Sequence, residues 1–257
     1  MSNITLTVLL FNVWNLPGIC TDGKSRERAL AISPHLNAYD VVILNEAFQN
    51  KDALLKDVVH QHRFVLKRPL SQFYTIFDSG VVILSKYPIV HTESEPYRMR
   101  RSYDWFAAKS LVMCTLNVKG TYVDVYGTHM QAGNSASETR ARSSQAVQVA
   151  KAVQEWSPLT RPIIFAGDLN MGPTLDPTCE TYSVHYGSRN DAIERTAAYM
   201  TMRDGAGLED VFSEGTDDEK QDINRFLVRN VKNASVTYVH SLRSLSDSDA
   251  VLCNITL

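Results

Sequence analysis

The stretch Ile163-Ile164-Phe165-Ala166-Gly167-Asp168-Leu169-Asn170 decides how the rest of the chain is interpreted. Its apolar residues predict a buried strand, and Gly167 predicts a sharp turn at the C-terminal edge of that strand. Asp168 and Asn170 are two residues apart, so on an extended backbone their side chains would face the same way. A carboxylate beside a carboxamide suits a phosphate oxygen held next to a hard metal ion. A Gly-Asp pair after a strand is also a common turn, so the remaining sequence must decide between the two interpretations.

The composition favours one domain over residues 1–257, because apolar strand patterns continue along the 257 residues without a linker-like gap. Hydrophobic residues make up 44% of the chain, which is enough for a substantial core. The formal net charge of -2 argues against a nucleic acid partner. We expect a monomer.

The sequence shows no membrane span and no secretion signal. No apolar stretch approaches the ~20 residues that a transmembrane helix needs, and a strand pattern follows Met1 without a signal-like segment. We therefore expect a cytoplasmic or peripheral membrane protein, or a secreted one if a signal was removed before residue 1. The four cysteines lack CxxC spacing, which argues against zinc and favours buried thiols: Cys20, Cys114, Cys179 and Cys253.

Short strand patterns dominate the chain, and helices separate them singly. Strands are predicted at 4–14, 40–44, 73–77, 80–84, 107–118, 121–128, 163–166, 223–228, 235–239 and 250–257. Helices are predicted at 25–39, where Pro34 must bend the helix or start a second turn, and at 51–62, 136–156 and 192–202. An antiparallel pair is expected for 73–77 with 80–84, and an irregular region for 172–190.

Four polar residues interrupt these apolar patterns, each at a strand end: Asn12, Glu46, His129 and Asp168. We therefore predict an α+β fold, a two-sheet β-sandwich flanked by helices in four layers (α/β/β/α), with a site along one rim.

Seven segments, in order along nearly the whole chain, resemble the endonuclease/exonuclease/phosphatase superfamily. They are 11–14, 40–46, 80–88, 127–132, Arg142 with Gln145, 167–171 and 245–247. Within the superfamily the chain is similar to the Mg-dependent neutral sphingomyelinases of bacterial type. The resemblance implies a DNase I-like fold and hydrolysis of sphingomyelin to ceramide and phosphocholine at a membrane surface. It also implies Mg²⁺ as cofactor, with Mn²⁺ or Co²⁺ as alternatives.

The resemblance also assigns roles to individual residues. Glu46 matches the principal Mg²⁺ ligand, Asn12 matches a residue that positions metal and phosphate, and His129 matches the residue that assists the leaving alkoxide. The remaining matches lie on the phosphate side of the site or near the substrate: Asp168, Asn170, Asp247 and Lys109. Taken singly, each has an ordinary alternative, such as a solvated glutamate, a turn asparagine, a structural histidine or a surface lysine.

Two positions depart from the pattern. Ser248 stands where the family has its general-base histidine, and a hydroxyl has no basic form near neutral pH. Asn224 stands where the family has the aspartate that orients this histidine, and an amide neither fixes the tautomer nor stabilises an imidazolium. Hydrolysis should therefore be impaired. The paired change favours natural divergence, although an introduced Ser248 is also compatible with the sequence.

Two further functions are compatible with the same residues. A nuclease or inositol-phosphate phosphatase could use this scaffold, although the absence of a basic bias weakens the nuclease alternative. A non-catalytic fold that binds lipid or a protein partner would explain Ser248 and Asn224. The loop at residues 97–106 combines arginines with aromatics, which suits a lipid headgroup surface as well as an ordinary exposed loop.

Overall fold

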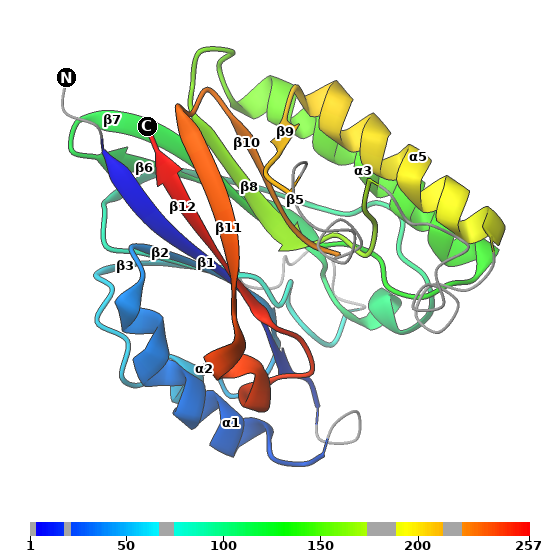
Figure 1. The fold of residues 1–257 in the computed structure, drawn as a ribbon. Helices are drawn as coiled ribbons and strands as arrows, with labels where there is room; N and C mark the ends of the chain where they lie inside the picture. The colour runs from blue at the N-terminus through cyan, green and yellow to red at the C-terminus, as the bar shows by residue number, and fades with distance from the viewer. Residues whose placement is uncertain (1–3, 18–21, 67–74, 174–188, 213–222) are drawn as a thin grey trace.

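The computed structural model describes residues 4–17, 22–66, 75–173, 189–212 and 223–257. Two six-stranded sheets pack face to face, and helices cover the outer face of each sheet (Figure 1). This arrangement confirms the predicted four-layer α/β/β/α sandwich.

The first sheet has the order β11-β12-β1-β2-β4-β3. Its strands are β1 (Thr5–Asn15), β2 (Val41–Ala47), β3 (His62–Val65), β4 (Val82–Ser85), β11 (Asn233–Val239) and β12 (Ala250–Thr256). The second sheet has the order β5-β6-β7-β8-β10-β9. Its strands are β5 (Ile89–Pro96), β6 (Ser110–Val118), β7 (Thr121–His129), β8 (Ile163–Asp168), β9 (Glu209–Asp210) and β10 (Asn224–Arg229). Each sheet has one parallel pair near its centre, β1 with β2 and β7 with β8.

Helices α3 (Ala136–Trp156) and α5 (Arg189–Ala206) cover the second sheet, and α1 (Ser25–Ile32) and α2 (Lys51–Leu54) cover the first (Figure 1). Three 3₁₀ helices complete the described elements: η2 (Ser33–Ala38), η4 (Ser102–Phe106) and η5 (His240–Leu245).

The core consists of three hydrophobic clusters. One lies between the two sheets, and one lies between each sheet and the helices outside it. Between the sheets, Ile43 of the first packs in the same cluster as Val125 and Ile164 of the second. Outside the second sheet, Phe165 packs with Val149 of α3. Because β2 and β8 are covered on both faces, their sequences are almost continuously apolar, so a polar residue on them stands out.

Two helix predictions are confirmed in detail. Helix α3 spans Ala136–Trp156 as predicted, and the capping box forms: Ser135 Oγ accepts the Glu138 N–H, and the Glu138 carboxylate accepts the Ser135 N–H at 2.8 Å. The segment 25–39 divides at Ser33, where α1 ends and η2 begins with Pro34 in its first turn. The proline therefore starts a second helical segment, which is one of the two predicted outcomes.

The helix predicted over residues 51–62 begins at Lys51 as expected, but its predicted length is wrong. Helix α2 covers only Lys51–Leu54, and the chain then runs to β3. The Asn37 carboxamide accepts the Val59 N–H at 2.8 Å and donates to the Asp57 carbonyl at 2.8 Å. These bonds to η2 replace the intrahelical bonds that a longer α2 would have made.

The predicted pairing of 73–77 with 80–84 is also wrong in the part of it that is described. Strand β4 pairs with β2 and β3, while Phe77 forms a parallel bridge with Ala107. Residues 73 and 74 lie outside the described ranges, as does most of the predicted irregular region 172–190. The helix predicted at 192–202 is present in the longer α5 (Arg189–Ala206).

Among the described residues, no helix combines the length and the apolar character needed to cross a membrane.

Candidate active site

The parallel strand pairs bring the predicted site residues to one rim of the sandwich. Asn12 on β1 pairs with Asn45 on β2, and Glu46 is the next residue after Asn45. His129 on β7 lies beside Asp168 on β8. Both sheets therefore end their parallel strands at this rim, and residues far apart in sequence become neighbours.

Glu46 is the centre of this group. Its side chain is half-buried and accepts a hydrogen bond from the Asn12 side chain, while its Oε2 atom is buried with no hydrogen-bond partner among the described residues. Burial raises the pKa of this carboxyl to about 7, and the negative charges of Asp168 and Asp247 act in the same direction. A buried carboxylate oxygen without a donor is what a cation would compensate.

Asn12 connects two carboxylates. Its amide nitrogen donates to Asp168 Oδ2 at 3.3 Å, and its amide oxygen accepts the Trp14 backbone N–H at 3.0 Å. In this orientation Asn12 directs hydrogen atoms at Asp168 and Glu46. Asn12 therefore holds the two acidic side chains in place, and its predicted part in binding metal stays a prediction.

Asp168 and Asn170 do not face the same way along an extended strand, so that expectation is wrong. Strand β8 ends at Asp168, and Asn170 has a left-handed backbone with φ 51°. Asp168 Oδ1 accepts the Asn170 backbone N–H at 3.1 Å, and Asn170 Nδ2 donates to the Met130 carbonyl at 3.3 Å. The two residues form a tight turn that fastens the end of β8 to the segment after β7.

The expected reason for Gly167 also needs correction. The residue lies inside β8 rather than in a turn, opposite Thr128 of β7. A Cβ atom at this position would come within 2.1 Å of the Thr128 carbonyl oxygen. Glycine is therefore required by the close approach of two strands.

His129 and Lys109 form a buried pair, and Lys109 is 2% exposed rather than a surface residue. Lys109 Nζ lies 3.2 Å from His129 Nε2, 2.8 Å from Asp104 Oδ1 and 3.0 Å from the Met130 carbonyl oxygen. These three partners account for the three hydrogens of the ammonium group. Burial, and then the Lys109 charge, hold the pKa of His129 well below its usual range.

The C-terminal motif reaches the same rim. Ser246 Oγ donates to the Asn12 carbonyl oxygen at 2.6 Å, which places the segment 246–248 against the end of β1. Asp247 is exposed and acts on the Glu46 carboxyl through its charge. Ser248 Oγ is buried and makes no hydrogen bond within the described residues. The position that the family resemblance assigns to the general base thus holds a buried hydroxyl with no hydrogen-bond partner in the described part of the chain.

Asn224 lies directly across from Asp168, on the neighbouring strand β10, and is 6% exposed. The strand predicted to carry it is confirmed, with bounds Asn224–Arg229. The side chain is therefore near the rim, and its role relative to position 248 stays a prediction.

Asn45 was missed as a site residue by the sequence reasoning. It is fully buried, accepts the Asp168 backbone N–H at 2.9 Å and donates to the Thr128 carbonyl oxygen at 3.0 Å. One carboxamide from the first sheet thus ties together β8 and β7 of the second. A polar residue at an inward position of an otherwise apolar strand was the available signal.

Arg195 of α5 was missed as well. Its guanidinium donates to the Asn170 carbonyl at 2.7 Å and to the Gly133 carbonyl at 2.8 Å. Arg142 of α3 donates to the same Gly133 carbonyl at 3.0 Å. The two helices thereby fix the segments that follow β7 and β8.

Three residues at the rim other than glycine have a left-handed backbone: Trp14 (φ 47°), Glu46 (φ 57°) and Asn170 (φ 51°). Such conformations cost about 1–3 kcal/mol each and are concentrated at functional sites. For a bulky residue such as Trp14 the conformation is a strong outlier. It is accompanied by an irregularity in the β1–β2 pairing between Asn12 and Asn15.

The oxygen atoms that the rim offers suit a hard divalent cation. Across the described ranges, no three His, Cys, Asp or Glu side chains are grouped so that they could hold a metal among them. Mg²⁺ is often bound by one or two carboxylates and keeps several waters. Glu46, with its buried oxygen that lacks a donor, is a suitable single carboxylate ligand.

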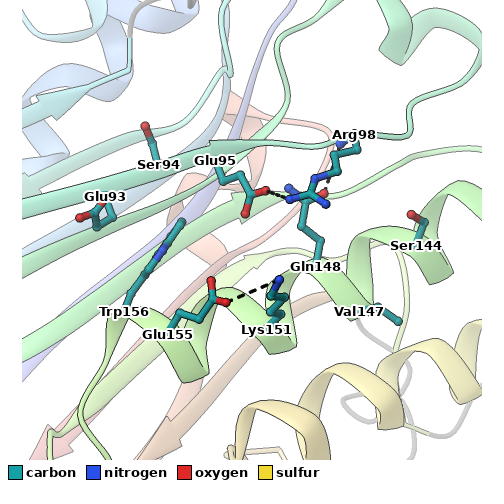
Figure 2. A pocket seen from close by; sticks show the side chains of 10 residues that line it. All are labelled: Glu93, Ser94, Glu95, Arg98, Ser144, Val147, Gln148, Lys151, Glu155 and Trp156. Atoms are coloured by element: carbon teal, nitrogen blue, oxygen red, sulfur yellow. Dashed lines mark hydrogen bonds and ion pairs between the residues drawn. The ribbon is translucent and has the colours of Figure 1, made fainter.

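The groove shown in Figure 2 is a different place. It has a volume of about 610 Å³, lies between β5 and α3, and contains none of the predicted site residues. Two of its carboxylates are paired, Glu95 with Arg98 at 2.8 Å and Glu155 with Lys151 at 3.6 Å (Figure 2). Its charged groups therefore give no indication of a ligand.

Comparison with known proteins identifies the family of the chain and its relatives. A model of the family described as "Endonuclease/Exonuclease/phosphatase family" matches residues 9–241. A putative neutral sphingomyelinase of Drosophila melanogaster is 27% identical over 185 residues, covering 66% of this chain and 40% of that protein. Sphingomyelin phosphodiesterase 2 of Rattus norvegicus is 26% identical over 219 residues, covering 80% of this chain and 50% of that protein. The chain thus spans about half the length of these relatives or less.

Solved structures share the fold over almost the whole chain. Sphingomyelinase C from Streptomyces griseocarneus has a TM-score of 0.73 at 22% identity, covering 98% of this chain and 99% of that one. A Staphylococcus aureus beta toxin mutant with bound magnesium ions has a TM-score of 0.70 at 18% identity, covering 97% and 99%. A humanized D. rerio TDP2 has a TM-score of 0.65 at 19% identity, covering 98% of both chains. At these identities the structures establish the fold alone.

Proposed function

The chain belongs to the endonuclease/exonuclease/phosphatase family, and on that premise we propose that it is a sphingomyelin phosphodiesterase, which hydrolyses sphingomyelin to ceramide and phosphocholine. The observation that carries the proposal is the convergence of Glu46, Asp168 and His129 on one rim, where Glu46 Oε2 is buried and receives no hydrogen bond from the residues that the structure describes. The two sphingomyelinase relatives support this substrate over others of the family.

Glu46 would hold a Mg²⁺ ion, with Mn²⁺ or Co²⁺ as alternatives, and Asn12 and Asp168 would complete its surroundings. When bound, the ion supplies positive charge beside the phosphate oxygens and so stabilises the transition state. The likeness to a magnesium-bound beta toxin supports this assignment.

Other side chains would bind and orient the phosphodiester. Asp168 and Arg195 fix the backbone of Asn170, and its carboxamide donates to the Met130 carbonyl at 3.3 Å, so the side chain is held beside the rim. Asp247 is exposed close to Glu46 and would contribute to the polar wall on the other side. Water would attack phosphorus in line with the departing ceramide oxygen.

The leaving oxygen needs a proton, and the Lys109–His129 pair would provide it. His129 Nε2 accepts from the Lys109 ammonium, so the imidazole is neutral and the pair together carries one positive charge. Lys109 would therefore act on the substrate through His129 rather than as an independent phosphate ligand. The Asp104 carboxylate fixes this arrangement from the other side.

The attacking water lacks a base. Ser248 cannot accept its proton near neutral pH, and general-base catalysis usually contributes about 10²–10⁴-fold. We propose that the chain as it stands hydrolyses sphingomyelin weakly or not at all.

The test measures phosphocholine released from sphingomyelin vesicles, with Mg²⁺ and with EDTA, by this chain and by its Ser248→His, Asn224→Asp variant. We expect Mg²⁺-dependent release, much faster in the double variant. If the double variant is folded, as judged by its thermal transition, and releases no phosphocholine, the substrate assignment fails.

A second enzymatic function, a nuclease or an inositol-phosphate phosphatase, remains the alternative within the family. The TDP2 structure has a TM-score close to those of the sphingomyelinases, so the fold alone does not separate these activities. Turnover of DNA or soluble phosphoinositides by the double variant, without turnover of sphingomyelin, would favour this alternative.

A non-catalytic function is favoured by Ser248 and Asn224 together. The chain would then bind Mg²⁺, lipid or a protein partner through the part of the rim around Glu46, where the residues match the family pattern. Isothermal titration calorimetry with Mg²⁺ and with phosphocholine tests this function, because binding of neither would leave only a protein partner.

A further inference from the structure

Strand β1 contains one residue more than β2 where the two strands pass Glu46. On β1, two residues separate Asn12 from Asn15, and both of these pair with β2. On β2, Glu46 alone separates their partners. The additional residue makes a β-bulge, and bulges change the direction of nearby side chains. Trp14 in the bulge and Glu46 opposite it both have left-handed backbones, so the bulge affects the rim from both strands.

The backbone of the bulge fixes the carboxamide of Asn12. The Trp14 N–H donates to Asn12 Oδ1 at 3.0 Å, which turns the amide nitrogen of Asn12 to the other side. There, this nitrogen donates to Asp168 Oδ2 at 3.3 Å and to the Glu46 carboxylate. A flipped carboxamide would direct its oxygen at two carboxylates and its nitrogen at an N–H group. The bulge therefore selects the orientation in which Asn12 donates to both acids.

Arg28 of α1 contacts both the backbone and the ring of Trp14. Its Nη2 atom donates to the Trp14 carbonyl at 3.0 Å, and its guanidinium carbon lies 4.4 Å from the centre of the Trp14 ring. Its Nη1 atom donates to Asp22 Oδ1 at 2.8 Å, and the residue is 8% exposed. A guanidinium is planar and has several donors, so it can stack on a ring and bind oxygens at the same time. Because a left-handed backbone is costly for a bulky residue, this double contact stabilises a conformation that Trp14 would otherwise leave.

Helix α1 holds Arg28 at a fixed place beside β1. The helix lies on the outer face of the first sheet (Figure 1), where Ala29 packs in the same cluster as Phe11 of β1. Ser25, at the start of the helix, donates to the Leu16 carbonyl at 3.1 Å. The guanidinium therefore reaches the bulge from an element that is itself packed against the sheet.

We propose that Arg28 is a positioning residue of the candidate active site, because it holds the bulge at Trp14 that orients Asn12. Asn12 in turn directs its hydrogens at Asp168 and Glu46. The inference rests on the proposed function, because it takes Glu46 as the metal ligand. Arg28 itself touches neither the ion nor the substrate. Without the guanidinium, the bulge relaxes and the Asn12 carboxamide is no longer held in one orientation.

The alternative is that Arg28 only fastens α1 to β1. Arg229 provides a matched comparison, because its guanidinium also donates to backbone carbonyls, three of them, at 3.0–3.4 Å. It lies five residues from Asn224 along β10, about 17 Å from the rim. If Arg28 were only a fastening, the loss of either arginine would affect the rim equally.

The first measurement follows the Asn12 carboxamide in the chain without metal. Heteronuclear NMR detects the hydrogens of each side-chain amide, and the Asn12 signals are those that disappear in Asn12→Ser. Hydrogen-bonded amides exchange with water more slowly than free ones. We expect Arg28→Met to speed the exchange at Asn12 about tenfold and Arg229→Met to change it by less than about twofold, although both lower the thermal transition.

The second measurement is the Kd of Mg²⁺ by isothermal titration calorimetry. Arg28→Met should raise this Kd about tenfold, the lower end of the effect of residues that orient a metal ligand, and Arg229→Met should change it by less than about twofold. In a Trp14→Gly chain, Arg28→Met should have less than about a twofold further effect, because glycine adopts the left-handed backbone without needing support.

Equal effects of Arg28→Met and Arg229→Met on the exchange at Asn12 would overturn the inference, because Arg28 would then only stabilise the fold. An undiminished effect of Arg28→Met in the Trp14→Gly chain would also overturn it, because Arg28 would then not act through the bulge. If Arg28→Met shows no thermal transition, Arg28→Lys takes its place. This variant keeps the charge and one group that can reach the Trp14 carbonyl, so it should show a smaller change of the same kind.

Failure of the proposed function is recognised separately. If the original chain binds no Mg²⁺, or if the Ser248→His, Asn224→Asp variant does not hydrolyse sphingomyelin, the proposed function fails. The exchange at Asn12 in the metal-free chain still tests Arg28 in that case. If Mg²⁺ binds and Arg28→Met leaves the exchange unchanged, the positioning role of Arg28 alone is refuted.

Discussion

The two sides of the rim differ in how completely their side chains are engaged. On one side, Glu46, Asn12 and Asp168 are joined by hydrogen bonds, and Lys109 has three partners. On the other side, Asp247 is exposed and Ser248 Oγ makes no hydrogen bond within the described residues. The side chains around Glu46 are thus held by mutual contacts, while Ser248, at the position that the family resemblance assigns to the general base, makes no side-chain hydrogen bond within the described residues.

The largest effect is expected on the rate of hydrolysis, when a histidine and an aspartate are introduced on the side of the rim that holds Ser248. The Ser248→His, Asn224→Asp variant should hydrolyse sphingomyelin about 10²–10⁴-fold faster than the chain as it stands, because it regains a base and the carboxylate that orients it. Steady-state release of phosphocholine measures the gain. Ser248→His alone is the control and should recover only part of it. If the double variant is no faster than the original chain, the side of the rim formed by Glu46, Asn12, Asp168 and Lys109 does not support hydrolysis either.

A second prediction concerns the complete side. Asn45→Leu should lower the free energy of unfolding by about 2–4 kcal/mol, because it leaves the Asp168 N–H and the Thr128 carbonyl buried without their partner. Asn37→Leu is the matched control. Asn37 also makes two hydrogen bonds to backbone, but in an exposed setting where water can replace it, so the cost should be below about 1 kcal/mol. Urea denaturation measures both, and equal costs would contradict the role given to Asn45.

Glu46 should make stability depend on pH when no metal is bound. Its pKa is about 7 in the folded chain and lower when unfolded, so the folded state binds the proton more tightly. Stability contributed by this group is present at acid pH and is lost as pH rises towards 7. Glu46→Gln should therefore stabilise the metal-free chain at alkaline pH by about 1–2 kcal/mol, a value reduced for partial exposure.

Thermal unfolding with and without Mg²⁺ measures this effect. Mg²⁺ should raise the melting temperature of the original chain and leave that of Glu46→Gln unchanged. An equal shift in both would mean that the ion binds elsewhere.

The smallest effects distinguish two neighbouring serines. Ser248→Ala should change stability by less than about 0.5 kcal/mol, because the hydroxyl has no hydrogen bond to lose among the described residues. Ser246→Ala should cost about 1 kcal/mol, because Ser246 Oγ donates to the Asn12 carbonyl at 2.6 Å. Denaturant titration compares them, and the reverse order would contradict the description of this segment.

The sequence predicted the layers and the strand-end positions because both depend on local patterns. Apolar strands delivering Glu46, His129 and Asp168 can be recognised one at a time, and the family resemblance put them in a common site. What could not be predicted depends on contacts between sheets. Asn45 matters because Asp168, 123 positions later, needs a partner for its N–H. Lys109 is buried because Asp104, His129 and Met130 surround it.

The wrong predictions have the same cause, because they too depend on contacts between segments that are distant in the sequence. Gly167 serves a contact with Thr128 that no local pattern reveals. The helical pattern over 51–62 does not extend to its predicted end, because Asn37 of η2 makes hydrogen bonds to the backbone of Asp57 and Val59.

The left-handed backbones of Trp14, Glu46 and Asn170 have a consequence for protein engineering. Glycine adopts this conformation without the cost that other residues incur. Selection for heat resistance would therefore tend to enrich glycine at these positions, and each gain in robustness would remove a side chain from the rim. At Glu46 and Asn170, a glycine that relieved the backbone would also remove a side chain that has a proposed role in the site.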